Sequence, residues 1–260
     1  MTSSFIPFVT MLGFALCSTS ALAQAEPASE RTLLLGAGAY VSTNPYTGAD
    51  DTVETGLLPF FVYKTDRFNI DLSGLSVTAF EVNGFTLEGR LSPRYLLVDP
   101  GEIQAFKTLK RDIGLDAGIK VTRTMGGFEF SAEYLHDVVG ETKGGEANLV
   151  AAYGFSPMER MTVGVAGTLS WKDSELATWL YGIRREDGLS YRYEFGDTPN
   201  TPSKGVFVPS LGVQMRYQLT ERLSVFTAAQ VEIYNSDITD SPLMKEDYSA
   251  SGFISLVRQF

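Results

Sequence analysis

The chain has 260 residues, and its 31 acidic against 21 basic side chains give a formal charge of -10. This charge argues against a nucleic-acid partner, because phosphate binding needs a basic surface. One cysteine and one histidine supply neither a structural zinc site, which takes about four such ligands, nor a disulfide framework, so we expect no metal and no cofactor. The 44 % hydrophobic content and the 25 glycines suit a folded, β-rich chain.

The first segment is predicted to be an export signal. Residues 5–22 form the one long apolar run of the chain. Ala21 and Ala23 then place small side chains at the two positions that a signal peptidase reads. We therefore predict a cleaved signal peptide at residues 1–23, followed by a short polar linker at residues 24–31.

The rest of the chain alternates apolar and polar residues with a period of two, which predicts β-strands. Residues 113–122 and 161–172 are clear examples. Runs of roughly 9–12 residues exceed the ~5–6 typical of soluble sheets and match tilted strands that cross a bilayer. Eleven strands are expected to begin near residues 32, 53, 67, 84, 112, 127, 145, 161, 205, 223 and 248.

The parity of this strand count predicts one further strand. Bacterial outer-membrane barrels normally have an even number of strands, with both chain ends in the periplasm. We therefore expect a twelfth strand within residues 96–109 or within residues 176–193. Twelve strands are the prediction, and ten strands are the alternative.

Two kinds of connection separate the predicted strands. Short turns such as Asn83-Gly84 supply the positive φ of tight hairpins. Long polar connections are expected at residues 42–52, 172–204 and 236–247. This asymmetry is typical of outer-membrane barrels, and the terminal Phe260 resembles the signal that the barrel assembly machinery reads. We predict that residues 32–260 form an antiparallel transmembrane β-barrel in the outer membrane of a Gram-negative cell, in contact with its lipid and lipopolysaccharide.

Several short motifs, in this order along the chain, resemble those of one family. They are Gly36-Ala37-Gly38-Ala39-Tyr40, Asn44-Pro45-Tyr46-Thr47-Gly48, Leu58-Pro59-Phe60-Phe61-Val62-Tyr63, Ser170-Trp171, Tyr181-Gly182-Ile183 and Asp240-Ser241-Pro242-Leu243. With them the chain resembles the MltA-interacting protein family, also called the MipA/OmpV family. The resemblance implies a non-enzymatic outer-membrane barrel that acts as a scaffold for a murein hydrolase and a peptidoglycan synthase. Other members are described as porin-like, so a small channel for polar solutes is the alternative.

The polar faces of the predicted strands are expected to line the barrel lumen. Both signs of charge occur there, which suits either a lumen plugged by ion pairs or a narrow pore that selects by charge. The lumen-lining candidates are Glu88, Arg90, Asp116, Lys120, Glu129, Glu133, Gln214, Arg216, Gln230 and Glu232. Aromatic rings near strand ends suit the level of the lipid headgroups. The candidates for such girdles are Tyr40, Tyr63, Tyr95, Tyr134, Trp171, Tyr217, Tyr234 and Tyr248.

The sequence offers little for catalysis. A barrel hydrolase would need a histidine with a serine or carboxylate partner, and His136 with Asp137 is the one neighbouring pair of that kind. By alternation, His136 shares a face with Phe128 and Tyr134, so it is expected to point toward the lipid and not the lumen. We therefore expect no catalytic residues. Acidic loop residues are expected to be solvated, because no calcium-binding spacing links them.

Overall fold

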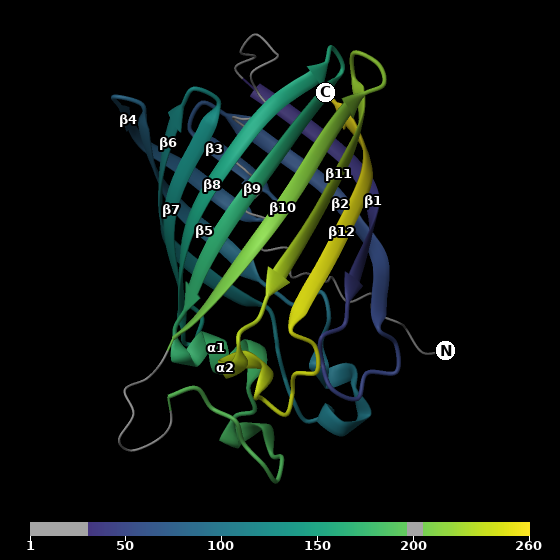
Figure 1. Cartoon of the computed structure of the whole chain (residues 1–260). Coiled ribbons are helices and arrows are strands. Elements are labelled where there is room, and N and C mark those ends of the chain that lie inside the picture. The colour runs from purple at the N-terminus through teal and green to yellow at the C-terminus, as the bar shows by residue number, and fades with distance from the viewer. Residues whose placement is uncertain (1–30, 197–204) are drawn as a thin grey trace.

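The computed structural model describes residues 31–196 and 205–260, which form one closed barrel of twelve antiparallel strands (Figure 1). Strands adjacent in sequence pair with each other, and the last closes against the first. The strands are β1 (Arg31–Thr43), β2 (Val53–Thr65), β3 (Phe68–Asp71), β4 (Gly74–Val82), β5 (Phe85–Arg94), β6 (Gly114–Met125), β7 (Phe128–Asp137), β8 (Gly145–Met158), β9 (Met161–Lys172), β10 (Val206–Gln218), β11 (Leu223–Ile233) and β12 (Tyr248–Gln259). The predicted fold class is therefore confirmed. The predicted signal peptide and linker lie outside the described residues, apart from Arg31, which begins β1.

The strand that the sequence pattern misses is β4. Residues 68–72 alternate like a single strand, but the chain reverses after the four residues of β3. The Asp71 carboxylate accepts hydrogen bonds from the Ser73 backbone N–H at 2.7 Å and from its hydroxyl at 2.6 Å. Gly74 follows with a φ of +117°, which favours glycine. This local turn splits one expected strand into the β3–β4 hairpin.

Neither of the two segments considered for the extra strand forms one. The helices of the described residues are η1 (Pro100–Glu102), η2 (Gln104–Phe106), α1 (Ser174–Tyr181), η3 (Arg185–Asp187) and α2 (Ser236–Thr239). Asp99 begins η1 by accepting from Gly101 N at 2.8 Å, and Asp173 begins α1 by accepting from Leu176 N at 2.9 Å. An aspartate at this position favours the start of a helix. Residues 96–109 and 176–193 therefore form helical turns and not a strand, although both segments are rich in apolar residues. No helix within the described ranges is long and apolar enough to cross a membrane.

The two ends of the barrel differ (Figure 1). Short turns follow β2, β4, β6, β8 and β10 at one end, which we call the turn end. The connections that carry the helices follow β5, β9 and β11 at the other end, which we call the loop end. The chain terminus lies at the turn end, where Phe260 N donates to Leu33 O at 2.9 Å. The turn at Asn83 (φ 50°) and Gly84 (φ 78°) has the two positive angles of a tight hairpin.

Side chains alternate between the inner and outer faces of the wall. On β7, Glu129 and Ser131 are buried toward the lumen, whereas Phe128 and Phe130 are exposed on the outer face. His136 is exposed on the same outer face as these rings. The apolar row therefore covers the outside of the barrel, and the row that carries the charges lines the inside.

Candidate functional site

The inner face of β5 to β9 carries ion pairs that join different strands of the wall. Arg90 Nε on β5 donates to Glu133 on β7 at 2.8 Å. The same guanidinium also donates to the hydroxyl of Ser76 and, at 3.3 Å, to that of Ser73. Both partners are largely buried, with 10 % of the Arg90 side chain and 14 % of the Glu133 side chain exposed. Solvent therefore screens this pair little.

A second network lies closer to the loop end. Arg94 Nε donates to Asp116 at 2.7 Å, and its Nη2 donates to Glu146 at 2.8 Å. Glu146 also accepts from the Lys172 ammonium and, at 2.6 Å, from the Ser170 hydroxyl. Lys172 in turn donates to Ser170 Oγ at 2.8 Å. Along the chain of contacts from Asp116 through Arg94 and Glu146 to Lys172 the charges alternate in sign, so the network links β5, β6, β8 and β9.

The remaining acidic and amide candidates lie on the same inner face. Glu88 and Lys120 stand opposite each other in the pairing of β5 with β6. Glu129 is buried on β7. On β11, Gln230 donates to Glu232 at 3.2 Å.

The inner face of β1, β2, β11 and β12 carries an apolar cluster. The rings of Phe60, Phe226 and Phe253 form a cluster, with centroids 5.3 Å apart for the first pair and 6.3 to 6.4 Å apart for the others. Gly36 and Gly38 occupy the inner face of β1 between these rings. A Cβ on Gly38 would come within 2.8 Å of the Phe253 ring. The two glycines of the first sequence motif therefore make room for the ring cluster.

β10 lies between β9, which takes part in the ion-pair network, and β11, which carries Phe226 of the ring cluster. Gln214 is buried there. Two residues further toward the turn end, Arg216 Nε donates to Ser224 Oγ at 3.3 Å. Arg216 stands directly opposite Phe226 in the pairing of β10 with β11. The structure thus places Arg216 on the strand next to the ring cluster of Phe60, Phe226 and Phe253.

A folded cap covers the loop end (Figure 1). Leu176, Trp179 and Leu180 of α1 are 0 % exposed. Arg111, from the connection between β5 and β6, donates to the Asp187 carboxylate at 3.1 Å and to Trp179 O at 2.6 Å. Its guanidinium also lies over the Trp179 ring, 5.9 Å from the centroid. The cap therefore has its own core, with a buried cation at its centre.

A further side chain ties the cap to the connection between β7 and β8. Glu141 accepts from Trp179 Nε1 at 2.9 Å and from Asp112 N at 3.1 Å. Arg184 donates to the backbone oxygen of Thr142 at 3.1 Å and to that of Glu141 at 3.3 Å. Three connections, those between β5 and β6, β7 and β8, and β9 and β10, are thus fastened to one another above the lumen.

A cavity of about 30 Å³ remains beneath the cap. Its lining includes Tyr46, Leu97, Tyr181, Glu232 and Tyr234. A space of this size holds about one or two water molecules. Burial raises the pKa of the Tyr46 and Tyr181 hydroxyls, so both stay neutral. Within the described residues, the cap therefore closes this end of the lumen.

The predicted girdle residues divide into two groups. On the outer face, Tyr134, Tyr217 and Tyr248 are exposed, and Tyr63 and Trp171 are half-buried. The girdle assignment is wrong for Tyr40 and Tyr234, which are only 7 % and 6 % exposed. Tyr40 has the inward parity of β1 and packs over Gly56, and Tyr234 belongs to the cap beyond β11. Tyr95 lies in a connection, where its hydroxyl donates to Leu72 O at 3.0 Å.

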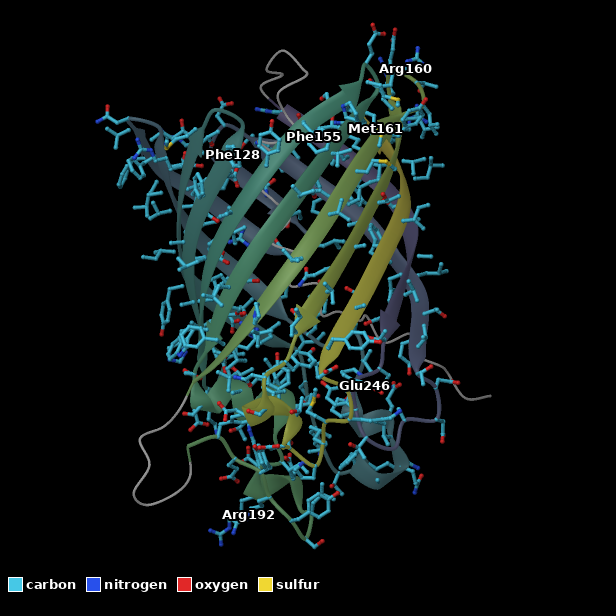
Figure 2. All side chains as sticks on the ribbon, in the orientation of Figure 1. Phe128, Phe155, Arg160, Met161, Arg192 and Glu246 are labelled. Carbon is cyan, nitrogen blue, oxygen red and sulfur yellow. The ribbon has the colours of Figure 1, made fainter. Side chains whose placement is uncertain are left out.

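An aromatic row that the sequence analysis did not single out lies near the turn end. Phe130, Phe128, Tyr153 and Phe155 follow one another on the outer face of β7 and β8, with successive centroids 6.2, 4.6 and 6.0 Å apart. Figure 2 places Phe128 and Phe155 close to this end of the barrel. The outward parity of these residues was visible in the sequence, but their contact across two strands depends on the register.

The network residues Arg94, Glu146 and Lys172 were also missed. Each follows the inward parity of its strand, so alternation extended to the strand ends would have found them. Arg111 lies in a connection without periodicity, and the sequence carries no signal for its burial. No group of three or more histidine, cysteine or acidic residues gathers at metal-binding distances in the described part of the chain.

A closed barrel with an apolar outer face and ion pairs in its lumen defines an integral outer-membrane β-barrel protein. A family comparison gives the same class. The model of the family described as "MltA-interacting protein MipA" matches residues 35–260, and the chain belongs to this family. The resemblance of the sequence motifs is therefore confirmed.

Curated relatives are outer-membrane proteins. "Outer membrane protein OmpV" of Vibrio cholerae serotype O1 is 24 % identical over 215 residues, which cover 80 % of this chain and 78 % of that protein. "Outer membrane protein Omp26La" of Vibrio anguillarum is 22 % identical over 211 residues, covering 80 % and 79 %. Among solved structures, the NanC porin is 10 % identical, with a TM-score of 0.41 over 88 % of this chain and 100 % of that chain. The predicted outer-membrane localisation is confirmed.

Proposed function

We propose that the protein is a non-enzymatic scaffold of the outer membrane that recruits peptidoglycan-remodelling enzymes, a murein hydrolase and a peptidoglycan synthase. The observation that carries this proposal is the closed lumen. The last six residues of α1, Leu176 to Tyr181, are buried over the loop end, and a cavity beneath them is about 30 Å³. A barrel closed in this way acts through its surfaces. The name of its family, MltA-interacting protein, also points to a protein partner.

The turn end is the surface that we assign to these partners. In outer-membrane barrels the short turns face the periplasm, where peptidoglycan lies. Met125 and Met158 are 50 % and 57 % exposed at this end. Arg160 lies in the turn between β8 and β9, as Figure 2 shows. Exposed apolar and basic side chains on short, rigid turns suit protein contacts.

Affinity capture tests the scaffold proposal. The barrel is extracted from outer membranes in mild detergent and used as bait for a purified murein hydrolase of the MltA type. Wild type is expected to enrich the hydrolase, and Arg160→Glu at the turn end is expected to reduce the captured amount severalfold. Arg192→Glu is the matched control, because Arg192 lies at the loop end (Figure 2). Absence of enrichment by wild type would contradict the proposal.

A porin-like channel for polar solutes is the second candidate. The charged inner face of β5 to β9 favours it, since paired charges of both signs line many pores. Planar-bilayer recordings separate the two functions. The scaffold proposal expects no reproducible conductance, whereas ion-selective steps from wild type would favour the channel.

A further inference from the structure

An open groove of about 800 Å³ crosses the outer wall of the barrel, with a lining that extends from β5 to β11. Ala132, Ala151 and Gly167 form its floor, because they are the smallest outward-facing residues along it. Ala151 stands directly opposite Gly167 in the pairing of β8 with β9. Larger apolar residues flank this floor, among them Phe130, Leu149 and Leu211. A hollow with apolar walls of this kind suits a hydrocarbon chain.

One end of the groove lies at the turn end of the barrel. Phe85, Arg123 and Phe130 stand side by side in the pairing of β5, β6 and β7, and all three line the groove. Phe85 is the first residue of β5, and Arg123 lies two residues before the end of β6. Six strand spacings of about 4.8 Å separate β5 from β11, so the groove is longer than one leaflet of the hydrocarbon core, which is about 15 Å thick. An acyl chain that starts at the turn end therefore has room along the groove.

Arg123 is the charged side chain of this lining. Its guanidinium carbon lies 4.5 Å from the centroid of the Phe85 ring. No carboxylate of residues 31–196 or 205–260 forms an ion pair with it, and a contact with a ring does not neutralise its charge. An arginine on the lipid face is costly at the midplane of the bilayer and is tolerated near the headgroups. Arg123 at the turn end therefore suits the phosphate of a lipid headgroup.

The outer wall is cationic at the turn end as a whole. Its outward-facing positions carry Arg31, Arg123 and Arg258, and each of these lies within three residues of a strand terminus at that end. In the strands that the structure describes, outward-facing positions carry no aspartate or glutamate. The short turns of such barrels face the periplasm. The cations therefore stand at the level of the periplasmic leaflet, which consists of phospholipid, and away from the leaflet that holds lipopolysaccharide.

A second copy of the barrel matches this groove less well than a lipid does. Contact between the walls of two copies brings outward-facing strand positions together, and those of the described strands offer Arg123 no carboxylate. A two-fold interface also presents the same surface, and so the same cation, from both sides. A phospholipid supplies the apolar chain and the anion together.

We propose that this groove is a binding site for an anionic phospholipid of the periplasmic leaflet. The lipid phosphate binds Arg123, and one acyl chain lies over Ala132, Ala151 and Gly167. The site prefers an anionic headgroup to a zwitterionic one, because the described outer wall offers the ammonium group of the latter no carboxylate. The site lies outside the lumen and does not depend on the recruitment of murein enzymes.

Native mass spectrometry tests the headgroup contact. The folded barrel is titrated in detergent with phosphatidylglycerol or with phosphatidylcholine of the same acyl chains. Wild type is expected to bind phosphatidylglycerol about tenfold more tightly, and Arg123→Gln is expected to lose most of this preference. Absence of a preference in wild type would overturn the proposal.

Arg258→Gln is the matched control for the headgroup contact. Arg258 is also an outward-facing arginine at the turn end, and its guanidinium carbon lies 5.1 Å from the centroid of the Phe260 ring. It does not line the groove, so this variant is expected to keep the preference of wild type. An equal loss in the two variants would assign the preference to the general charge of this end and would overturn the site.

A second pair of variants tests the groove without altering Arg123. A Cβ on Gly167 would lie 3.7 Å from Leu211 Cδ2, so a larger side chain fits there and fills the floor. Gly167→Leu is expected to weaken binding of phosphatidylglycerol severalfold. Gly252→Leu is the control, because Gly252 faces outward on β12, away from the groove, and a Cβ there also makes only ordinary contacts. Equal binding by the two variants would contradict an acyl chain in the groove.

The same spectra report whether a second copy occupies the groove. Monomers that carry phosphatidylglycerol support the proposal. A wild-type dimer that Gly167→Leu dissociates and Gly252→Leu does not would overturn it in favour of contact between copies. Folding of each variant is checked by heat-modifiable gel migration before titration.

Discussion

The guanidinium of Arg111 forms a buried ion pair with the carboxylate of Asp187, with 3.1 Å between Nη1 and Oδ1. The two side chains are 1 % and 5 % exposed. Arg111 belongs to the connection between β5 and β6, and Asp187 ends the 3-10 helix that follows α1. One charge pair therefore joins two loops that lie far apart in the sequence. Arg111 also donates to the carbonyl oxygens of Trp179 and Gly182, so it holds the centre of the cap.

Replacing Arg111 is expected to loosen the cap. Arg111→Met keeps most of the side-chain volume but leaves the Asp187 carboxylate buried without its partner. Breaking a buried pair in this way costs about 3–5 kcal/mol. Limited proteolysis of the folded barrel measures the effect, and cleavage within residues 173–196 is expected to become much faster while the strands stay intact.

The control for this variant is the exposed ion pair of the same loop. Glu186 is 63 % exposed in its side chain and accepts from Arg184 at 3.3 Å. Surface pairs contribute only about 0–1 kcal/mol, so Glu186→Gln is expected to leave the cleavage rate near that of wild type. Equal acceleration by the two variants would show that the buried pair does not hold the cap.

A methyl group on Gly38 is expected to disrupt the barrel. A Cβ there would lie 2.2 Å from Ile254 O and 2.8 Å from the Phe253 ring, so backbone and ring would both have to move. Overpacking of this kind costs about 1–3 kcal/mol or more. Gly38→Ala should therefore lower the fraction of heat-modifiable barrel recovered from membranes. In Gly89→Ala, a Cβ meets nothing within 4 Å, and this control should fold like wild type.

Alternation predicted the faces of the strands because side-chain direction in a strand is a local property. Glu88, Arg90 and Asp116 were placed on the inner face for this reason. The break between β3 and β4 was missed because the Asp71 turn interrupts a pattern that otherwise continues. The short ladder of β2 with β3 depends on which strands pair and how far, and the sequence of a single strand does not contain this information.

Acidic pH is expected to tighten the connection between β5 and β6. Burial raises the pKa of the Asp99 and Glu102 carboxyls. A raised pKa means that the folded state holds the proton more tightly than the unfolded state. The stability that these groups contribute is therefore fully present below the unfolded pKa and is lost as the pH rises through the folded pKa. Hydrogen exchange of Ile103 N, which donates to Pro100 O at 3.1 Å, should show protection that falls over this window after correction for intrinsic exchange rates.

The Asp99→Asn variant checks the source of this pH dependence. An asparagine oxygen can still accept the bond from Gly101 N, but the amide carries no charge at any pH. The fall in Ile103 protection should therefore become shallower in the variant. An unchanged profile would place the titrating group elsewhere.

Removing the charge of Glu146 is expected to destabilise the barrel more than any exposed change, because its carboxylate lies between two buried cations. In Glu146→Gln, Arg94 keeps the Asp116 carboxylate, but Lys172 loses the carboxylate of its ion pair and retains neutral acceptors such as the Ser170 hydroxyl at 2.8 Å. An uncompensated buried charge costs about 3–5 kcal/mol, whereas replacing both partners by neutral groups is often close to neutral. Glu146→Gln with Lys172→Met should therefore recover part of the loss. The temperature at which the folded gel band converts to the unfolded one measures both variants, and Glu159→Gln in an exposed turn is the control. A double variant no more stable than Glu146→Gln would mean that the cation left behind is not the cause of the loss.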